Sequence, residues 1–141
     1  MEELKLTRSQ MEQMIALARA EAPLEACGLL GGKRGRVLCV YPATNELHSP
    51  TRYSIRAIDL LAALEDMEAR DWEPTPLGIY HSHPHGPEVP SETDIAESYY
   101  PEAVYIIIAH LDRTQPSLRG FHIVDGQVSE VRLRISNGHQ F

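Results

Sequence analysis

The sequence of 141 residues has no unbroken apolar run near the roughly 20 residues that a membrane-spanning helix needs. Its longest apolar run, residues 103–109, is short and rich in β-branched side chains, which predicts a buried strand. The N-terminus carries Glu2 and Glu3 and lacks the basic-then-apolar layout of a signal peptide. We therefore expect no membrane partner and a cytoplasmic location.

Cysteine is scarce, since Cys27 and Cys39 are the only two. Thiols of cytosolic proteins normally stay reduced, so we expect no disulfide. The pair also lacks the paired Cys-x-x-Cys spacing of a zinc ribbon. The simplest interpretation is that both are small buried residues on strands.

Positive charge is in the minority. The formal net charge is -7, and Lys5 and Lys33 are the only lysines. The closest approach to a basic cluster, residues 33–36, falls in a predicted turn. Because nucleic acids and anionic membranes bind basic patches, neither is expected as a partner.

The length fits a single domain, residues 1–141. Thr7 and Gln10 form a capping-box pattern that predicts a helix start, and Pro23 should lie at or beyond the end of that helix. Helical spacing also runs through residues 55–70, and a short helix is expected over 91–99. Apolar segments predict strands at 27–30, 37–41, 77–82, 103–110, 118–124 and 128–135. This order predicts an α/β fold, a mixed β-sheet flanked by helices.

Residues 79–94 carry the residues most suited to chemistry. His81 and His83 are two apart, so on a strand their imidazoles face the same side. Asp94 follows a proline-rich loop that can fold back over the strand end. Two imidazoles and one carboxylate are a common ligand set for catalytic zinc.

Each element of this pattern also has a simpler interpretation. A His-x-His pair on an exposed strand is usually solvated, and Ser91 with Asp94 is a typical helix N-cap pattern. The two interpretations of Asp94 are compatible, because one carboxylate can bind a metal while Ser91 fixes the helix start.

The combination of His-Ser-His-Pro at 81–84, Ser-x-x-Asp at 91–94 and a distant Glu25 resembles the JAMM motif of the MPN-domain zinc metalloproteases. The resemblance covers almost the whole chain, since it includes residues 25–31, a middle segment with Asn45, Ser49, Pro50 and Tyr53, and a closing hairpin over 121–128. It implies the cytidine-deaminase-like α/β/α architecture of that family. The deaminase signature itself is missing, which excludes deamination.

The resemblance also implies a role for each motif residue. His81, His83 and Asp94 would hold one Zn2+ per chain, which would make hydroxide available at neutral pH. Glu25 would be the general base, and Ser91 would donate a hydrogen bond at the oxyanion. By sequence alone Glu21 is as good a base candidate, but only Glu25 matches the motif. The other histidines (His48, His85, His110, His122 and His139) and Trp72, Tyr99 and Tyr100 are expected to be surface, packing or rim residues.

Short prokaryotic members of this family resemble hydrolases that act on ubiquitin-like sulfur-carrier proteins. The predicted function is therefore a zinc metallopeptidase that cleaves after the C-terminal Gly-Gly of such a carrier, with the extended tail pairing to a sheet edge. The alternatives are a non-catalytic MPN scaffold for protein partners and a small-molecule zinc amidohydrolase. The complete motif disfavours the scaffold. The carrier, the leaving group and the oligomeric state stay open, with a homodimer as one option.

Overall fold

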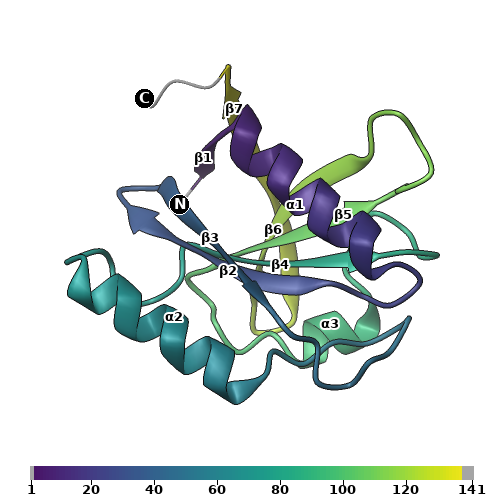
Figure 1. Ribbon diagram of the computed structural model, residues 1–141, viewed down its shortest axis with the longest axis horizontal. Coiled ribbons are helices and arrows are strands. Elements are labelled where there is room, and N and C mark those ends of the chain that lie inside the picture. The colour runs from purple at the N-terminus through teal and green to yellow at the C-terminus, as the bar shows by residue number, and fades with distance from the viewer. Residues whose placement is uncertain (1, 138–141) are drawn as a thin grey trace.

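The computed structural model describes residues 2–137, which form one continuous sheet with helices packed on it (Figure 1). The strands are β1 (Glu3–Thr7), β2 (Cys27–Lys33), β3 (Arg36–Ala43), β4 (Gly78–His83), β5 (Val104–Ala109), β6 (Ser117–Val124) and β7 (Gln127–Ser136). The helices are α1 (Arg8–Glu21), α2 (Ala57–Ala69) and α3 (Glu92–Ala96).

The strand order is β1-β3-β2-β4-β5-β6-β7, and β1 also pairs with β7, so the sheet closes on itself. Strands β4 and β5 run parallel, as do β1 and β7, whereas the hairpins β2–β3 and β6–β7 are antiparallel. The predicted mixed sheet with flanking helices is therefore confirmed.

The two long helices cover opposite faces of this sheet. On β2, Leu30 packs into the cluster that contains Met14 of α1, whereas its neighbour Leu29 packs with Met67 of α2. Because successive strand residues point to opposite faces, α1 and α2 lie on different sides. Figure 1 shows α1 above the central strands and α2 below them.

Three elements differ from the sequence expectation. Strand β1 was not predicted; Leu4 and Leu6 on it are fully buried, but five residues are too few for a clear periodic pattern. Strand β2 continues through the predicted turn to Lys33, and only Arg34 and Gly35 form the turn, both with positive φ. The third helix ends at Ala96, earlier than expected.

Other expectations hold. The Thr7 capping box is present, α1 ends before Pro23, and both cysteines are free. Cys27 is buried and Cys39 is half-buried, each on a strand. Within residues 2–137 no helix is long and apolar enough to cross a membrane.

Candidate metal centre

Strand β4 places both motif histidines at its C-terminal end, on one face. His81 and His83 share that face with Ile79, which packs against Tyr105 and Ile123. Strand β4 lies in the middle of the sheet, between β2 and β5, so the two imidazoles are held by backbone pairing on both sides. The solvated interpretation of the His-x-His pair is wrong, because the side chains are only 1% and 5% exposed.

Asp94 completes a triangle of three possible ligand atoms. The Nε2 atoms of His81 and His83 are 3.0 Å apart, and Oδ2 of Asp94 lies 3.1 and 3.0 Å from them. Tetrahedral zinc with bonds of about 2.0–2.1 Å would have ligand atoms roughly 3.3 Å apart, close to these separations. The donor set and its spacing therefore fit one zinc ion.

Hydrogen bonding orients the ring of His83. Its Nδ1 lies 2.7 Å from the carbonyl oxygen of Pro87, so Nδ1 carries a proton and donates it. In the neutral ring this leaves the lone pair on Nε2, which faces Asp94. A carbonyl on the remote ring nitrogen is the usual support of a metal-binding histidine.

The three side chains also shift one another's acidity. Burial lowers the pKa of His81. Burial also acts to lower the pKa of His83, but hydrogen bonds to Asp94 and to the Pro87 carbonyl outweigh it, and the net direction is upward. Burial raises the pKa of the Asp94 carboxyl, yet its contacts with the two histidines hold that pKa well below the usual range. Asp94 is therefore ionised and suited to bind a cation.

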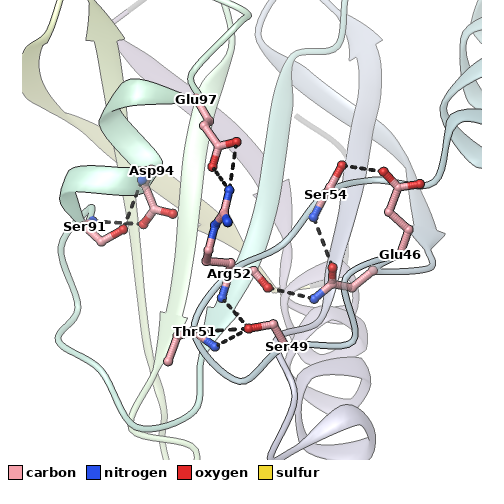
Figure 2. Close-up of polar contacts among 9 residues, drawn as sticks. Glu46, Ser49, Thr51, Arg52, Ser54, Ser91, Asp94 and Glu97 are labelled. Carbon is pink, nitrogen blue, oxygen red and sulfur yellow. Dashed lines mark hydrogen bonds and ion pairs between the residues drawn. The ribbon is translucent and has the colours of Figure 1, made fainter.

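Ser91 and Asp94 form the capping box that starts α3 (Figure 2). The Ser91 hydroxyl oxygen accepts from the Asp94 backbone N–H at 3.0 Å, and Asp94 Oδ2 accepts from the Ser91 N–H at 2.9 Å. The same Oδ2 faces both histidines, so the capping and ligand interpretations of Asp94 are compatible in one geometry.

Glu25 is buried beside this triangle, with 3% of its surface exposed. Its backbone is fixed on both sides: its N–H donates to the Ser49 carbonyl, and its own carbonyl accepts from Asn45 Nδ2 at 3.1 Å. The next residue, Ala26, bonds in both directions to Ser82, which stands between the two histidines. These contacts bring the Glu25 segment against the end of β4.

The Glu25 carboxyl does not have the properties of an ordinary surface acid. Burial raises its pKa to about 8, although the charge of nearby His83 lowers it in part. Among residues 2–137 its Oε1 has no hydrogen-bond partner, and neither does Nδ1 of His81. Glu21, the rival candidate, is exposed on the last turn of α1. The structure thus brings only Glu25 to the site.

Two residues at the site had no predicted role. Asn45 makes four hydrogen bonds, donating to the carbonyls of Glu25 and Arg52 and accepting from two backbone N–H groups. Tyr53 stacks on the ring of His81 with centroids 4.3 Å apart. Both lie in the segment that resembles the family's middle segment, and that was the only signal in the sequence.

A cavity of about 230 Å³ opens next to Asp94. Tyrosines line much of it, among them Tyr53, Tyr99 and Tyr105. The ion pair between Arg52 and Glu97 ties the middle segment to the residue after α3 (Figure 2). Tyr99 is 74% exposed at this cavity, so it lies at the rim and not in the core.

Among residues 2–137, only His81 and His83 join Asp94 in the ligand triangle, and the other histidines lie apart from it. His85 is exposed in the loop after β4, and His110 pairs with Glu88 at 3.2 Å. Trp72 packs against the α2 cluster. His139 lies outside the described residues.

Comparison with known proteins agrees with this geometry. The model of the family described as prokaryotic homologs of the JAB domain matches residues 7–123. The chain belongs to this family.

Among curated relatives, the CysO-cysteine peptidase of Mycobacterium tuberculosis is 39% identical over 124 residues, covering 86% of this chain and 84% of the relative. The probable TtuB-protein conjugate cleaving protease of Thermus thermophilus is 36% identical over 125 residues, covering 88% and 78%.

Solved structures give the same result for the fold. A Desulfitobacterium hafniense protein, known from its solution structure, has a TM-score of 0.86 at 37% identity, covering 95% of this chain and 93% of that one. A JAB1/MPN domain protein of Archaeoglobus fulgidus has a TM-score of 0.60 at 18% identity, covering 93% and 97%. The MPN-type architecture expected from the resemblance is therefore confirmed.

Proposed function

We propose that this protein is a zinc metallopeptidase that hydrolyses the bond after the C-terminal Gly-Gly of a ubiquitin-like sulfur-carrier protein. The observation that carries the proposal is the convergence of His81 Nε2, His83 Nε2 and Asp94 Oδ2 within 3.1 Å of one another, beside a buried Glu25. The two curated relatives, named for cleaving CysO-cysteine and TtuB conjugates, support the choice of substrate class.

In this proposal His81, His83 and Asp94 hold one zinc ion. The bound ion supplies Lewis-acid activation of the scissile carbonyl and of the attacking water.

Glu25 acts as the proton carrier. When water adds to the carbonyl carbon, Glu25 Oε1 accepts one of its protons and then delivers it to the leaving amine nitrogen as the C–N bond breaks. The products are a carrier ending in a Gly-Gly carboxylate and a free amine, from cysteine or from an isopeptide-linked partner. Burial of Glu25 supports this role, because a carboxylate removed from water is a stronger base than an exposed one.

Ser91 supports the oxygen that gains charge. Its hydroxyl oxygen accepts from Asp94 N–H, which leaves the hydroxyl proton available to the scissile carbonyl oxygen. The role is worth roughly 3 kcal/mol of transition-state stabilisation where it has been measured in other enzymes.

The sheet order limits where the extended tail could pair with a sheet edge, and that pairing stays a prediction. Strand β4 has β2 on one side and β5 on the other, so an extended tail cannot add to the strand that carries the histidines. We infer that the tail is held by the segments that border the site, residues 45–54 and 84–90.

We also propose that residues 1–141 form a single catalytic domain that acts in the cytoplasm. The sheet that runs without a break from β1 to β7 supports the single domain.

The test uses two carrier substrates, one ending in Gly-Gly joined to cysteine and one with both glycines changed to alanine. Intact-mass spectrometry should detect release of cysteine from the first and little from the second, because glycine permits close approach of the tail. Equal cleavage of both would refute the Gly-Gly assignment. Cleavage of neither, with rapid hydrolysis of a small dipeptide, would indicate the small-molecule amidohydrolase instead, and no hydrolysis at all would indicate the scaffold.

A further inference from the structure

In the loop after β4, Glu88 contacts residues of the sheet, and the preceding residue, Pro87, contacts His83. The carboxylate of Glu88 accepts a hydrogen bond from Arg119 Nη1 at 3.0 Å and lies 3.2 Å from Nε2 of His110. Arg119 is on β6 and His110 directly follows β5, so both contacts come from the sheet. The Ser117 hydroxyl and the Arg119 guanidinium hold the pKa of Glu88 below its usual range, as expected for an anchored carboxylate.

Arg119 is itself held in place. Its Nε and Nη2 donate to the two carboxylate oxygens of Glu130 on β7 at 2.9 and 2.7 Å, and its guanidinium lies 5.3 Å from the ring centre of Phe121. A forked contact of this kind fixes the guanidinium plane. The remaining guanidinium nitrogen, Nη1, is thereby directed at Glu88.

Glu88 directly follows Pro87, the residue whose carbonyl orients the His83 ring. The carbonyl that accepts from His83 Nδ1 belongs to Pro87, and its peptide bond joins Pro87 to Glu88. A peptide unit is planar, and the proline ring fixes the backbone torsion before it. Anchoring Glu88 therefore limits how far the Pro87 carbonyl can turn away from the imidazole.

We propose that Glu88 is a positioning residue: by fastening the loop to Arg119 and His110, it keeps the Pro87 carbonyl on His83 and so holds His83 Nε2 toward Asp94. The inference rests on the proposed role of His83 as a zinc ligand. Glu88 makes no contact with the ligand triangle that the structure shows; it acts through the peptide that it shares with Pro87.

The size of the effect should be moderate. The side chains of Glu88 and Arg119 are 37% and 31% exposed, so water screens their attraction. Loss of the outer support of a metal-binding histidine typically weakens metal binding by about 10–100-fold. Glu88 does not touch His83 itself but acts through Pro87, so we expect its loss to weaken zinc binding by roughly tenfold, the lower end of this range.

The test compares Glu88→Gln with Glu130→Gln in the full chain. Both variants remove a carboxylate from Arg119, but only Glu88 belongs to the loop. Zinc release to a chromogenic chelator should be roughly tenfold faster in Glu88→Gln. In Glu130→Gln it should be faster by a smaller factor, because Arg119 Nη1 can still bond to Glu88 although its guanidinium is less firmly oriented.

A second readout does not need the metal. In zinc-free protein, at a pH where the His83 ring is neutral, its ¹⁵N shifts should show the proton on Nδ1 in the parent and a mixture of tautomers in Glu88→Gln. Unchanged zinc release and unchanged ring shifts in Glu88→Gln would overturn the inference, and so would equal changes in Glu130→Gln. If Glu88→Gln fails to fold, Arg119→Lys replaces it, with the same direction expected. Failure of the parent to bind zinc would count against the proposed function alone, because the ring shifts would still decide the role of Glu88.

Discussion

Replacement of Asn45 by alanine should affect both stability and activity, although Asn45 is neither a predicted ligand nor a predicted base. The side chain is 7% exposed and makes four hydrogen bonds to backbone groups. The bond to the Glu25 carbonyl is buried, and the three others are partly buried. Alanine can replace none of them.

The magnitude follows from these four contacts. A buried carbonyl left unpaired costs about 1–3 kcal/mol, and each partly buried bond contributes about 0.5–1.5 kcal/mol net. Because water can reach the partly buried groups, we expect Asn45→Ala to lower the free energy of unfolding by about 3 kcal/mol. That is a large share of the roughly 5–15 kcal/mol typical of a small domain. A small displacement of the Glu25 segment should also lower kcat by roughly a hundredfold.

Urea unfolding and turnover of a Gly-Gly conjugate measure the two effects. Asn45→Asp keeps both acceptor bonds but places a carboxylate against the carbonyls of Glu25 and Arg52, so it should be destabilised as well. Glu46→Gln is the matched control, since the Glu46 carboxylate accepts an exposed hydrogen bond from the Ser54 hydroxyl and makes none of the bonds to Glu25 or Arg52. A loss below about 1 kcal/mol in Asn45→Ala, with normal turnover, would show that these four hydrogen bonds do not position Glu25.

The remaining predictions concern the motif residues. Metal analysis should find one zinc per chain in the parent and none in the double variant His81→Ala/His83→Ala, and full zinc content in the variant would disprove the ligand assignment. Glu25→Gln should retain zinc and fold but lose turnover, because it removes a proton acceptor; loss of zinc or near-normal activity would contradict this role. Ser91→Ala should lower kcat roughly a hundredfold if the hydroxyl serves the oxyanion. If Ser91 is only a cap, the thermal midpoint should fall instead, by the equivalent of about 1 kcal/mol.

Local patterns predicted the parts of the site that depend on local geometry. The two-residue period of a strand placed His81 and His83 on one face, and the capping-box spacing placed Ser91 against Asp94. These contacts join residues only a few positions apart, so they follow from local geometry once the strand and the helix have formed.

The contacts that position Glu25 could not be predicted in this way. Asn45 and Ser82 bind its segment from parts of the chain that are distant in sequence. Neither residue type signals such a role by itself, because asparagine and serine are more often found in turns and on the surface. The same limit applies to Glu88 and Arg119, whose pairing depends on where the loop after β4 meets β6.

The register of β2 against β4 is what joins the Glu25 segment to the histidines. In this antiparallel pair Cys27 lies opposite His81, and the bonds between Ala26 and Ser82 continue the same register beyond the strand. Glu25 therefore comes next to His83, on the face that both histidines share. A shift of one residue would turn Glu25 to the opposite face.

Gly28 and Tyr80 hold that register. They are opposite each other in the pair, and a Cβ at Gly28 would collide with the Tyr80 ring, which is completely buried and has no room to move. Only glycine lets the two backbones pair with the ring lying across them. Gly28 therefore fixes the register of β2 against β4. This register places the Glu25 carboxylate at the end of β4, beside the imidazoles of His81 and His83.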